Sequence, residues 1–195
     1  MKYLSTKKGF INPISLLILM SVAMPIAFNA WSAMLNNFVV EKAAFTGVEI
    51  GILQSLREVP GFLSFTLIFV LLIIKEQTFA VFALALLGLG VCMTGFFPTV
   101  YGLYFTTILM STGFHYFEAV KQSLSLQWLS KDEAPMVLGR LLAVGSLTSL
   151  IVYGCLWALL EVFQLPYLVN FVIAGGICIL LAFVMYIGFP SFPSK

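Results

Sequence analysis

Long apolar runs occupy most of this 195-residue chain and restrict its fold more than any other feature. Hydrophobic residues make up 61% of the sequence and charged residues 9%, whereas soluble domains carry about 25% charged residues. A helix of about 20 apolar residues crosses a bilayer, and only helices or closed barrels satisfy every backbone polar group in lipid. Because the runs are long and continuous, we expect an all-α integral membrane protein embedded in the lipid bilayer.

Six runs of spanning length follow one another, joined by short polar connections. The first run has a basic start like a signal peptide, but it continues to spanning length and therefore predicts an uncleaved helix. We expect a single six-helix transmembrane domain over residues 1–195, with residues 190–195 beginning a cytoplasmic linker. The predicted transmembrane helices cover residues 14–37, 47–74, 78–97, 100–128, 135–160 and 168–189.

Positive charges predict the orientation of these helices, because cytoplasmic connections are enriched in Lys and Arg. With the N-terminus inside, Lys42 is the one basic residue on the outer side, and Arg57 and Lys121 lie within spans. The other seven basic residues then lie on the cytoplasmic side. We therefore expect a multi-pass protein of the plasma (cell inner) membrane with both termini in the cytoplasm.

One face of the fourth run is polar. Ser111, His115, Glu118 and Gln122 are spaced by four, three and four residues, which places them on one side of an α-helix. Lys121 lies three residues after Glu118 and within reach of it. Charges at membrane depth normally face a bundle interior or a water-filled cavity. This face is therefore expected to meet water, a substrate or a polar partner.

The first and second runs carry further polar groups. Asn29 lies on a polar face of the first run, where Pro25 predicts a kink. Arg57 and Glu58 are adjacent in the second run and point about 100° apart on a helix, so we expect one to face the cavity and the other to pair with a neighbouring helix. The third and sixth runs have no charge. This distribution indicates inner helices around a cavity and outer helices that face lipid.

Each of these groups also has a structural interpretation. His115 could be a satisfied structural histidine, Glu118 and Lys121 could form an ion pair without function, and Arg57 could brace two helices. Taken together, ionisable groups inside a membrane favour function. The candidate substrate and proton pathway consists of Asn29, Arg57, Glu58, His115, Glu118, Lys121 and Gln122.

Other chemistries lack the residues that they need. A metal site requires several His, Cys or acidic ligands, and the chain has one histidine and three isolated cysteines. A serine-type intramembrane protease needs its nucleophile and histidine on separate helices, whereas Ser111 and His115 share one. The scattered basic residues also argue against nucleic acid. We expect no catalytic residues, no metal and no cofactor, and therefore no enzyme.

Two short echoes indicate an internal repeat. ILMS occurs at residues 18–21 and again at 108–111, in the first and fourth runs. VEIGIL at 48–53 opens the second run, and MVLGRL at 136–141 opens the fifth. The order is the same in both halves, and the two triplets would begin on opposite sides of the membrane. The echoes therefore predict a 3+3 inverted repeat of helices.

The stretch FTGVEIGILQSLREVPGFLSF at residues 45–65 and the region from LMSTGFHYFEAVKQ to GRLLAVGSL at 109–147 carry a family resemblance. With the six-span topology, they resemble the N-terminal half of a major facilitator superfamily (MFS) transporter. The resemblance implies that the first and fourth helices line a central cavity and that a second six-helix half, missing chain or another copy, completes the unit. The Gly-, Asp- and Arg-rich loop of the family is replaced by KEQ at 75–77, and the fourth-span arginine of proton-coupled members is absent.

These observations predict a transporter that moves a small solute by alternating access. Glu118 or His115 is a candidate proton carrier, because a carboxylate in a cavity of low dielectric constant and an imidazole can both titrate near neutral pH. The alternative is a non-transporting membrane subunit or assembly factor whose polar stripe docks a partner helix. Sugars, organic anions, amino acids and peptides all remain open as substrates.

Overall fold

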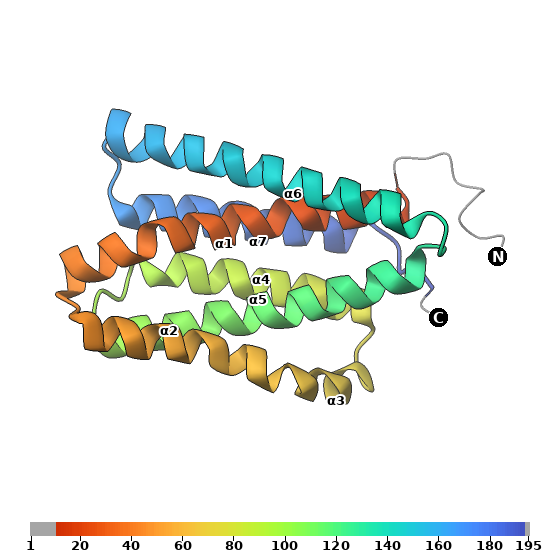
Figure 1. The fold of residues 1–195 in the computed structure, drawn as a ribbon, viewed down its shortest axis with the longest axis horizontal. Coiled ribbons are helices and arrows are strands. Elements are labelled where there is room, and N and C mark those ends of the chain that lie inside the picture. The colour runs from red at the N-terminus through yellow and green to blue at the C-terminus, as the bar shows by residue number, and fades with distance from the viewer. Residues whose placement is uncertain (1–10, 194–195) are drawn as a thin grey trace.

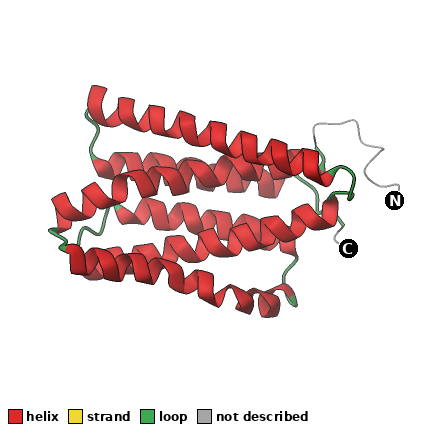
Figure 2. Ribbon diagram, viewed as in Figure 1, coloured by secondary structure: helices red, strands yellow, loops and turns green. Residues whose placement is uncertain are grey.

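The structure, a computed structural model, describes residues 11–193, and this part of the chain contains helices and no strand. The helices run up and down along one common axis (Figures 1 and 2). The elements are α1 (Pro13–Ala43), α2 (Gly47–Phe62), the 3-10 segment η1 (Leu63–Thr66), α3 (Leu67–Leu71), α4 (Glu76–Thr94), α5 (Val100–Trp128), α6 (Ala134–Trp157), its π-helical end η2 (Ala158–Val162) and α7 (Tyr167–Gly188).

The ends of the helices follow local capping signals. The side chain of Asn12 accepts a hydrogen bond from the amide of Ser15 at 2.9 Å and caps the start of α1. This helix continues past the predicted end at residue 37, to Ala43, and stops where Ala44 adopts a left-handed conformation with φ 52°. Thr46 and Glu49 form a capping box at the start of α2.

All six predicted runs coincide with helical segments, and the ends of these segments differ from the predicted ones.

The second predicted span departs from a continuous helix. Pro60 lies inside α2, and the α-helix gives way to η1 directly after Phe62. Proline has no amide hydrogen to donate and clashes with the preceding turn, which weakens a helix at that point. The hydroxyl of Thr66 donates to the carbonyl of Leu63 at 2.7 Å and stabilises the tighter turn. The expectation of one unbroken helix over 47–74 is wrong, because the segment breaks at residue 63 and its helical part ends at Leu71.

Four helical segments of the described chain are long and apolar enough to cross a membrane. This finding supports a membrane protein. The α2 helix falls short because it has only 16 residues, and the polar face of α5 lowers the hydropathy of a helix that is 29 residues long. The four segments are Pro13–Ala43, Glu76–Thr94, Ala134–Val162 and Tyr167–Gly188.

The bundle has a front layer, formed by α1, α2, α5 and α6, and a rear layer, formed by α4 and α7. The central helix α1 packs against α6 and α7, the central helix α5 packs against α2 and α4, and α4 packs against α7. In Figure 1, α4 and α7 lie behind α1 and α5, while α6 and α2–α3 lie at the two flanks. The charged residues that the sequence singled out belong to front-layer helices, α2 and α5.

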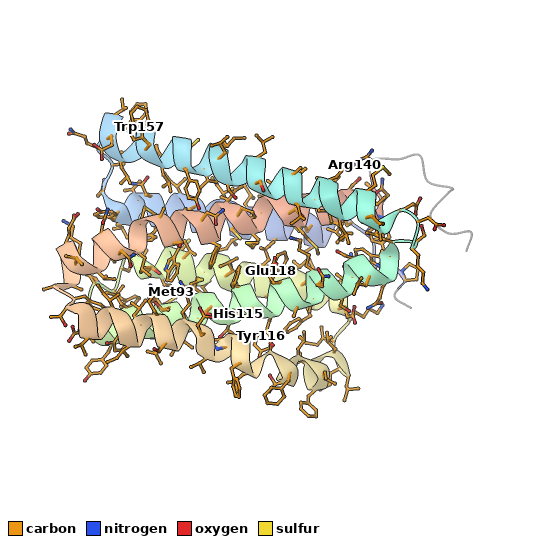
Figure 3. All side chains as sticks on the ribbon, in the orientation of Figure 1. Met93, His115, Tyr116, Glu118, Arg140 and Trp157 are labelled. Atoms are coloured by element: carbon orange, nitrogen blue, oxygen red, sulfur yellow. The ribbon has the colours of Figure 1, made fainter. Side chains whose placement is uncertain are left out.

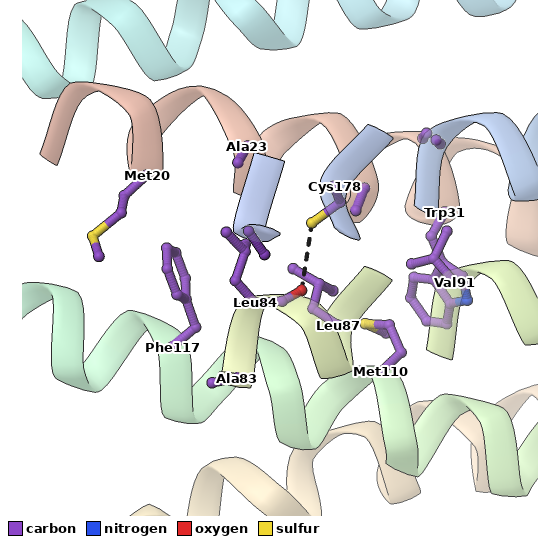
Figure 4. Close-up of a cluster of buried hydrophobic side chains, with 14 of the residues drawn as sticks. Met20, Ala23, Trp31, Ala83, Leu84, Leu87, Val91, Met110, Phe117 and Cys178 are labelled. Carbon is purple, nitrogen blue, oxygen red and sulfur yellow. Dashed lines mark hydrogen bonds between the residues drawn. The ribbon is translucent and has the colours of Figure 1, made fainter. Parts of the chain in front are cut away.

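Glycines allow the rear helices to touch. A Cβ atom added to Gly88 of α4 would lie 2.7 Å from the carbonyl oxygen of Gly175 in α7, and one added to Gly175 would lie 2.6 Å from the sulfur of Cys92. Small residues of this kind let membrane helices approach closely. Next to this contact, the thiol of Cys178 donates to the carbonyl of Leu84 at 3.5 Å inside the apolar core (Figure 4).

The chain folds back across the bundle after α7. We call residues 190–193 the C-terminal strap. The side-chain amide of Gln77 donates to the carbonyl of Pro190 and accepts from the amide of Phe192, both at 2.9 Å. The indole of Trp128 donates to the last carbonyl of the strap at 3.2 Å and meets the ring of Phe192 edge-on, with centroids 5.6 Å apart. The strap therefore joins the start of α4 to the end of α5. Residues 194–195 of the predicted linker lie outside the described residues.

Candidate functional site

The candidate site residues surround the middle of the two central helices. Phe28 is the central residue of α1 and Phe114 that of α5. Their rings stack with centroids 4.1 Å apart and planes 13° apart. Asn29 and His115 each follow one of these rings directly in the chain. The polar groups of α1 and α5 therefore begin at mid-depth, beside an aromatic contact that joins the two helices.

Glu58 lies between two positively charged or chargeable side chains. The guanidinium of Arg57 donates through Nε and Nη2 to Oε1 of Glu58, at 2.9 and 2.8 Å. The other oxygen, Oε2, lies 3.8 Å from Nε2 of His115 on α5. Among the ion pairs of residues 11–193, this is the only one between two helices. Arg57 therefore pairs with Glu58 on α2 itself, and Glu58 also contacts the neighbouring helix α5 through His115.

A glycine makes room for the imidazole of His115. A Cβ atom on Gly61 of α2 would lie 2.8 Å from Cε1 of the ring. The side chain of His115 therefore rests on the backbone of α2, one residue beyond Pro60 and just before the break at η1. This close approach explains why the ring reaches Glu58, which lies one turn earlier on α2.

Two hydroxyl groups of α5 bind the same stretch of α2 and η1. Ser111 donates to the backbone carbonyl of Arg57, and the hydroxyl of Tyr116 lies 2.6 Å from that of Thr66. Figure 3 shows His115 and Tyr116 beside one another on α5, near the α2–α3 segment. Together with the contact of His115, these hydrogen bonds connect α5 to the region of the helix break through three residues, Ser111, His115 and Tyr116.

Glu118 and Lys121 form a separate pair. Their charged atoms lie 3.5 Å apart, and both residues belong to α5, so this ion pair joins no two helices. The ammonium of Lys121 also lies 6.0 Å from the centre of the Phe117 ring on the same helix. Gln122 follows on the exposed side of α5. The predicted stripe is therefore present on one helix, but its second half has no charged partner on another helix.

Asn29 serves a different helix pair. Its amide donates to the hydroxyl of Ser149 on α6 at 2.7 Å, and Ser149 donates in turn to the carbonyl of Gly145 at 2.8 Å. The seven predicted residues therefore fall into three groups: Arg57, Glu58 and His115 between α2 and α5, Asn29 between α1 and α6, and Glu118, Lys121 and Gln122 along α5.

Sequence reasoning missed several residues that build the site. Gly61 and Thr66 lie near the helix break, and the dipeptide Pro60–Gly61 was the available signal for it. Tyr116 follows His115 directly and points about 100° away from it on the helix, so the spacing of the polar face did not include its hydroxyl. Ser149 offered no signal of its own, because a serine in an apolar run most often bonds to its own helix.

Charges within the site cancel helix by helix. Arg57 compensates Glu58 on α2, and Lys121 compensates Glu118 on α5. His115 is the one histidine of the chain.

A comparison of the chain with protein-family models, curated proteins and solved structures found no match in any of the three. The functional argument below therefore rests on this geometry and on the sequence.

Proposed function

We propose that this chain is a six-helix transport unit of the MFS type, which moves a small solute across the plasma (cell inner) membrane by alternating access. The observation that carries the proposal is the depth of the charged groups. Arg57, Glu58 and His115 meet near the middle of the bundle, and the side chain of Glu58 is 59% exposed. Lipid cannot solvate an exposed carboxylate, so such groups face a water-filled cavity or a protein partner. A solute pathway provides such a cavity.

The packing of the helices supports a 3+3 inverted repeat. The repeat matches α1 with α5, α2 with α6 and α4 with α7. Under this match, the observed contact α1–α6 corresponds to the observed contact α5–α2. In the same way, α1–α7 corresponds to α5–α4. The α4–α7 pair is converted into itself. Transporters built from inverted repeats place substrate at the midplane, between the repeats, which is where the candidate site lies.

Individual residues follow the same exchange. Ser21 and Ser111 end the two copies of ILMS. The carbonyl of Ser21 lies 3.6 Å from the position of a Cβ atom on Gly145 of α6, and Ser111 donates to the backbone of Arg57 of α2. Gly145 and Arg57 each lie nine residues after the start of their own segment, MVLGRL or VEIGIL. In both copies the serine therefore lies where the first helix of the repeat meets the second, which supports the repeat. The contacts themselves differ, because the hydroxyl of Ser111 donates to α2 whereas the hydroxyl of Ser21 is buried without a hydrogen-bond partner among the described residues.

The positions of the basic residues support cytoplasmic termini. The start of α1 and the end of α7 lie at one end of the bundle (Figure 1). The connections that carry Lys75 and Lys131 lie at that end, whereas Lys42 belongs to the last turn of α1 at the other end. An excess of positive charge marks the cytoplasmic side.

A second six-helix unit is the partner that we propose for the front layer. The side chains of Glu58 and Gln122 are exposed there, and so is Ser146 of α6. A partner with a matching polar face would enclose these groups in a central pathway. The unit can be supplied by further chain or by another copy of this one.

A stabilisation assay tests the transport proposal. The chain in lipid nanodiscs is heated with a hexose, a dicarboxylate, an amino acid or a dipeptide, and its melting temperature is compared with that of H115Q and of the exposed control F105L. We expect one solute class to stabilise wild type and F105L but not H115Q, and to accumulate in vesicles that contain the wild type. Absence of stabilisation in all three proteins, together with no accumulation of any solute, contradicts transport. Equal stabilisation in all three contradicts a role of His115 in solute binding. A co-purifying membrane protein that docks on the front layer would instead favour the subunit.

A further inference from the structure

The contact between Glu58 and His115 is longer than a hydrogen bond. The two atoms lie 3.8 Å apart, beyond the 2.7–3.2 Å range of a hydrogen bond but within that of an ion pair. Arg57 already occupies Oε1 of Glu58, so Oε2 is the oxygen that faces the ring. A proton on Nε2 of His115 would turn the contact into a charged pair between α2 and α5.

The surroundings of His115 contain no competing counter-charge from another helix. On α2, Arg57 and Glu58 lie near the ring, whereas Glu49 lies in the first turn and is bound to Thr46, and η1 (Leu63–Thr66) has no charged group. Beside the ring, α1 presents Phe28 and Asn29, which do not titrate. On α5 itself, the nearest titratable groups are Tyr116, bound to Thr66, and Glu118, paired with Lys121. Glu58 is therefore the group that responds to a charge on His115.

The Glu58–His115 pair lies where protonation of His115 can affect the position of α2 relative to α5. His115 rests on Gly61, between Pro60 and the break at residue 63, where the continuity of the helix is already weakened. A ligand shifts a conformational equilibrium only through different affinities for the two states. A charged pair across two helices supplies this difference, because it is strong only while α2 and α5 are close.

The second carboxylate of the stripe lacks this property. Glu118 and Lys121 lie on one helix, and the distance between them does not depend on how α5 sits against α2. Protonation of Glu118 would remove a charge without changing any charged contact between helices. The sequence left Glu118 and His115 open as proton carriers, and the geometry favours His115.

We propose that Glu58 and His115 form a proton-binding switch, and that a proton is the co-substrate of this unit. One proton from water binds Nε2 of His115, which forms an N–H bond, and the imidazolium then donates to Oε2 of Glu58. When α2 moves away from α5, this N–H bond breaks and the proton returns to water. No other covalent bond is formed or broken. The coupling of this step to a solute rests on the proposed transport function, whereas the switch itself can be observed without any solute.

A two-signal pH titration of the whole chain in nanodiscs tests the switch. Because the sequence contains one histidine, ¹⁵N-histidine labelling of protein without a histidine tag reports on His115 alone. Spin labels at the exposed positions I68C and L126C, in a background without the native cysteines, report the distance between α3 and α5. Between about pH 5 and 8, the range in which histidines commonly change charge, we expect both signals to change together.

Variants separate the switch from ordinary effects of pH. E58Q and H115Q should abolish the pH-dependent change in distance, and E118Q should retain it. E58D, which keeps a carboxylate, controls for loss of folding in E58Q and should retain part of the response. A distance that stays constant while His115 titrates, a histidine signal that does not change, or a response lost in E118Q but kept in E58Q would overturn the proposal. A pH response without solute stabilisation would leave the switch standing and reject transport, and the reverse result would reject the switch alone.

Discussion

The ring of Phe28 lies parallel to the ring of Phe114, with centroids 4.1 Å apart, at the centres of the two central helices. The stack fills part of the space between α1 and α5 at mid-depth. If a solute reaches Glu58 or His115, as proposed, we expect it to pass in front of the central helices and not between them. This places any pathway on the side of the bundle opposite α4 and α7.

The aromatic stack should contribute measurable coupling between the two helices. In a double-mutant cycle of F28L and F114L, we expect a coupling free energy of about 0.5–1.5 kcal/mol, the usual range for aromatic pairs. Thermal or denaturant unfolding in detergent measures it. The matched cycle combines F28L with F105L, and Phe105 is an exposed ring on α5, the helix of Phe114. This cycle should give no coupling free energy. Equal values in the two cycles would contradict a specific stack.

Gly175 and its neighbour Gly176 allow a close test of the rear contact. A Cβ at Gly175 would lie 2.6 Å from the sulfur of Cys92, whereas nothing lies within 4 Å of one at Gly176. We expect G175A to lower the free energy of unfolding by about 1–3 kcal/mol through overpacking. G176A should keep a free energy of unfolding close to that of the wild type. If G175A is as stable as G176A, the backbones of α4 and α7 are not in close contact at Gly175.

The bond between Asn29 and Ser149 should hold α6 against α1. Hydrogen bonds between membrane helices average about 0.6 kcal/mol and reach about 1.7 kcal/mol, so S149A should destabilise the protein by that order. Ser146 lies exposed on the same helix, and S146A should be neutral. The measurement is thermal unfolding of both variants, and a larger loss in S146A would count against the bond.

The C-terminal strap should open when its anchor on α4 is removed. In a background without the native cysteines, we expect Q77A to raise the labelling rate of S191C several-fold, because both hydrogen bonds of the Gln77 side chain to the strap are lost. K75A alters a neighbouring exposed side chain and should leave the rate unchanged. A rate that is equal in Q77A and K75A would show that Trp128 alone holds the strap.

The orientation of the bundle can be measured in intact cells. With the termini in the cytoplasm, K42C should react with a membrane-impermeant thiol reagent and K131C should react only after permeabilisation. The two positions lie at opposite ends of the bundle. The inverse pattern would reject the proposed topology.

The sequence was sufficient for the helices but not for their partners. Run length and hydropathy predicted the extent of α4, α6 and α7, because the bilayer sets the length of an apolar helix. The spacing of Glu118 after His115 likewise predicted a shared face, since helical periodicity is local. The break after Phe62 was missed although Pro60–Gly61 signalled it locally, whereas the contact of Thr66 in η1 with Tyr116 could not be predicted because it joins two helices.

Pairing across helices could not be predicted for the same reason. Asn29 and His115 look equivalent in the sequence, as polar residues at the centres of α1 and α5. The structure directs Asn29 to Ser149 of α6 and His115 to Glu58 of α2, and only the order in which helices pack decides between these partners. Gly61 had no visible role until the imidazole was found resting on it.

The contact of Gly88 with Gly175 also fixes the longitudinal register of the rear layer. A slide of one helical turn, about 5.4 Å, would bring Leu84 or Cys92 to the place that Gly88 holds against the backbone of α7. No space exists there for either side chain, so a slide of α4 along α7 by one turn is unfavourable. If a proton or a solute changes the shape of the bundle, we therefore expect a tilt or bend of the front helices over a rear surface of constant length.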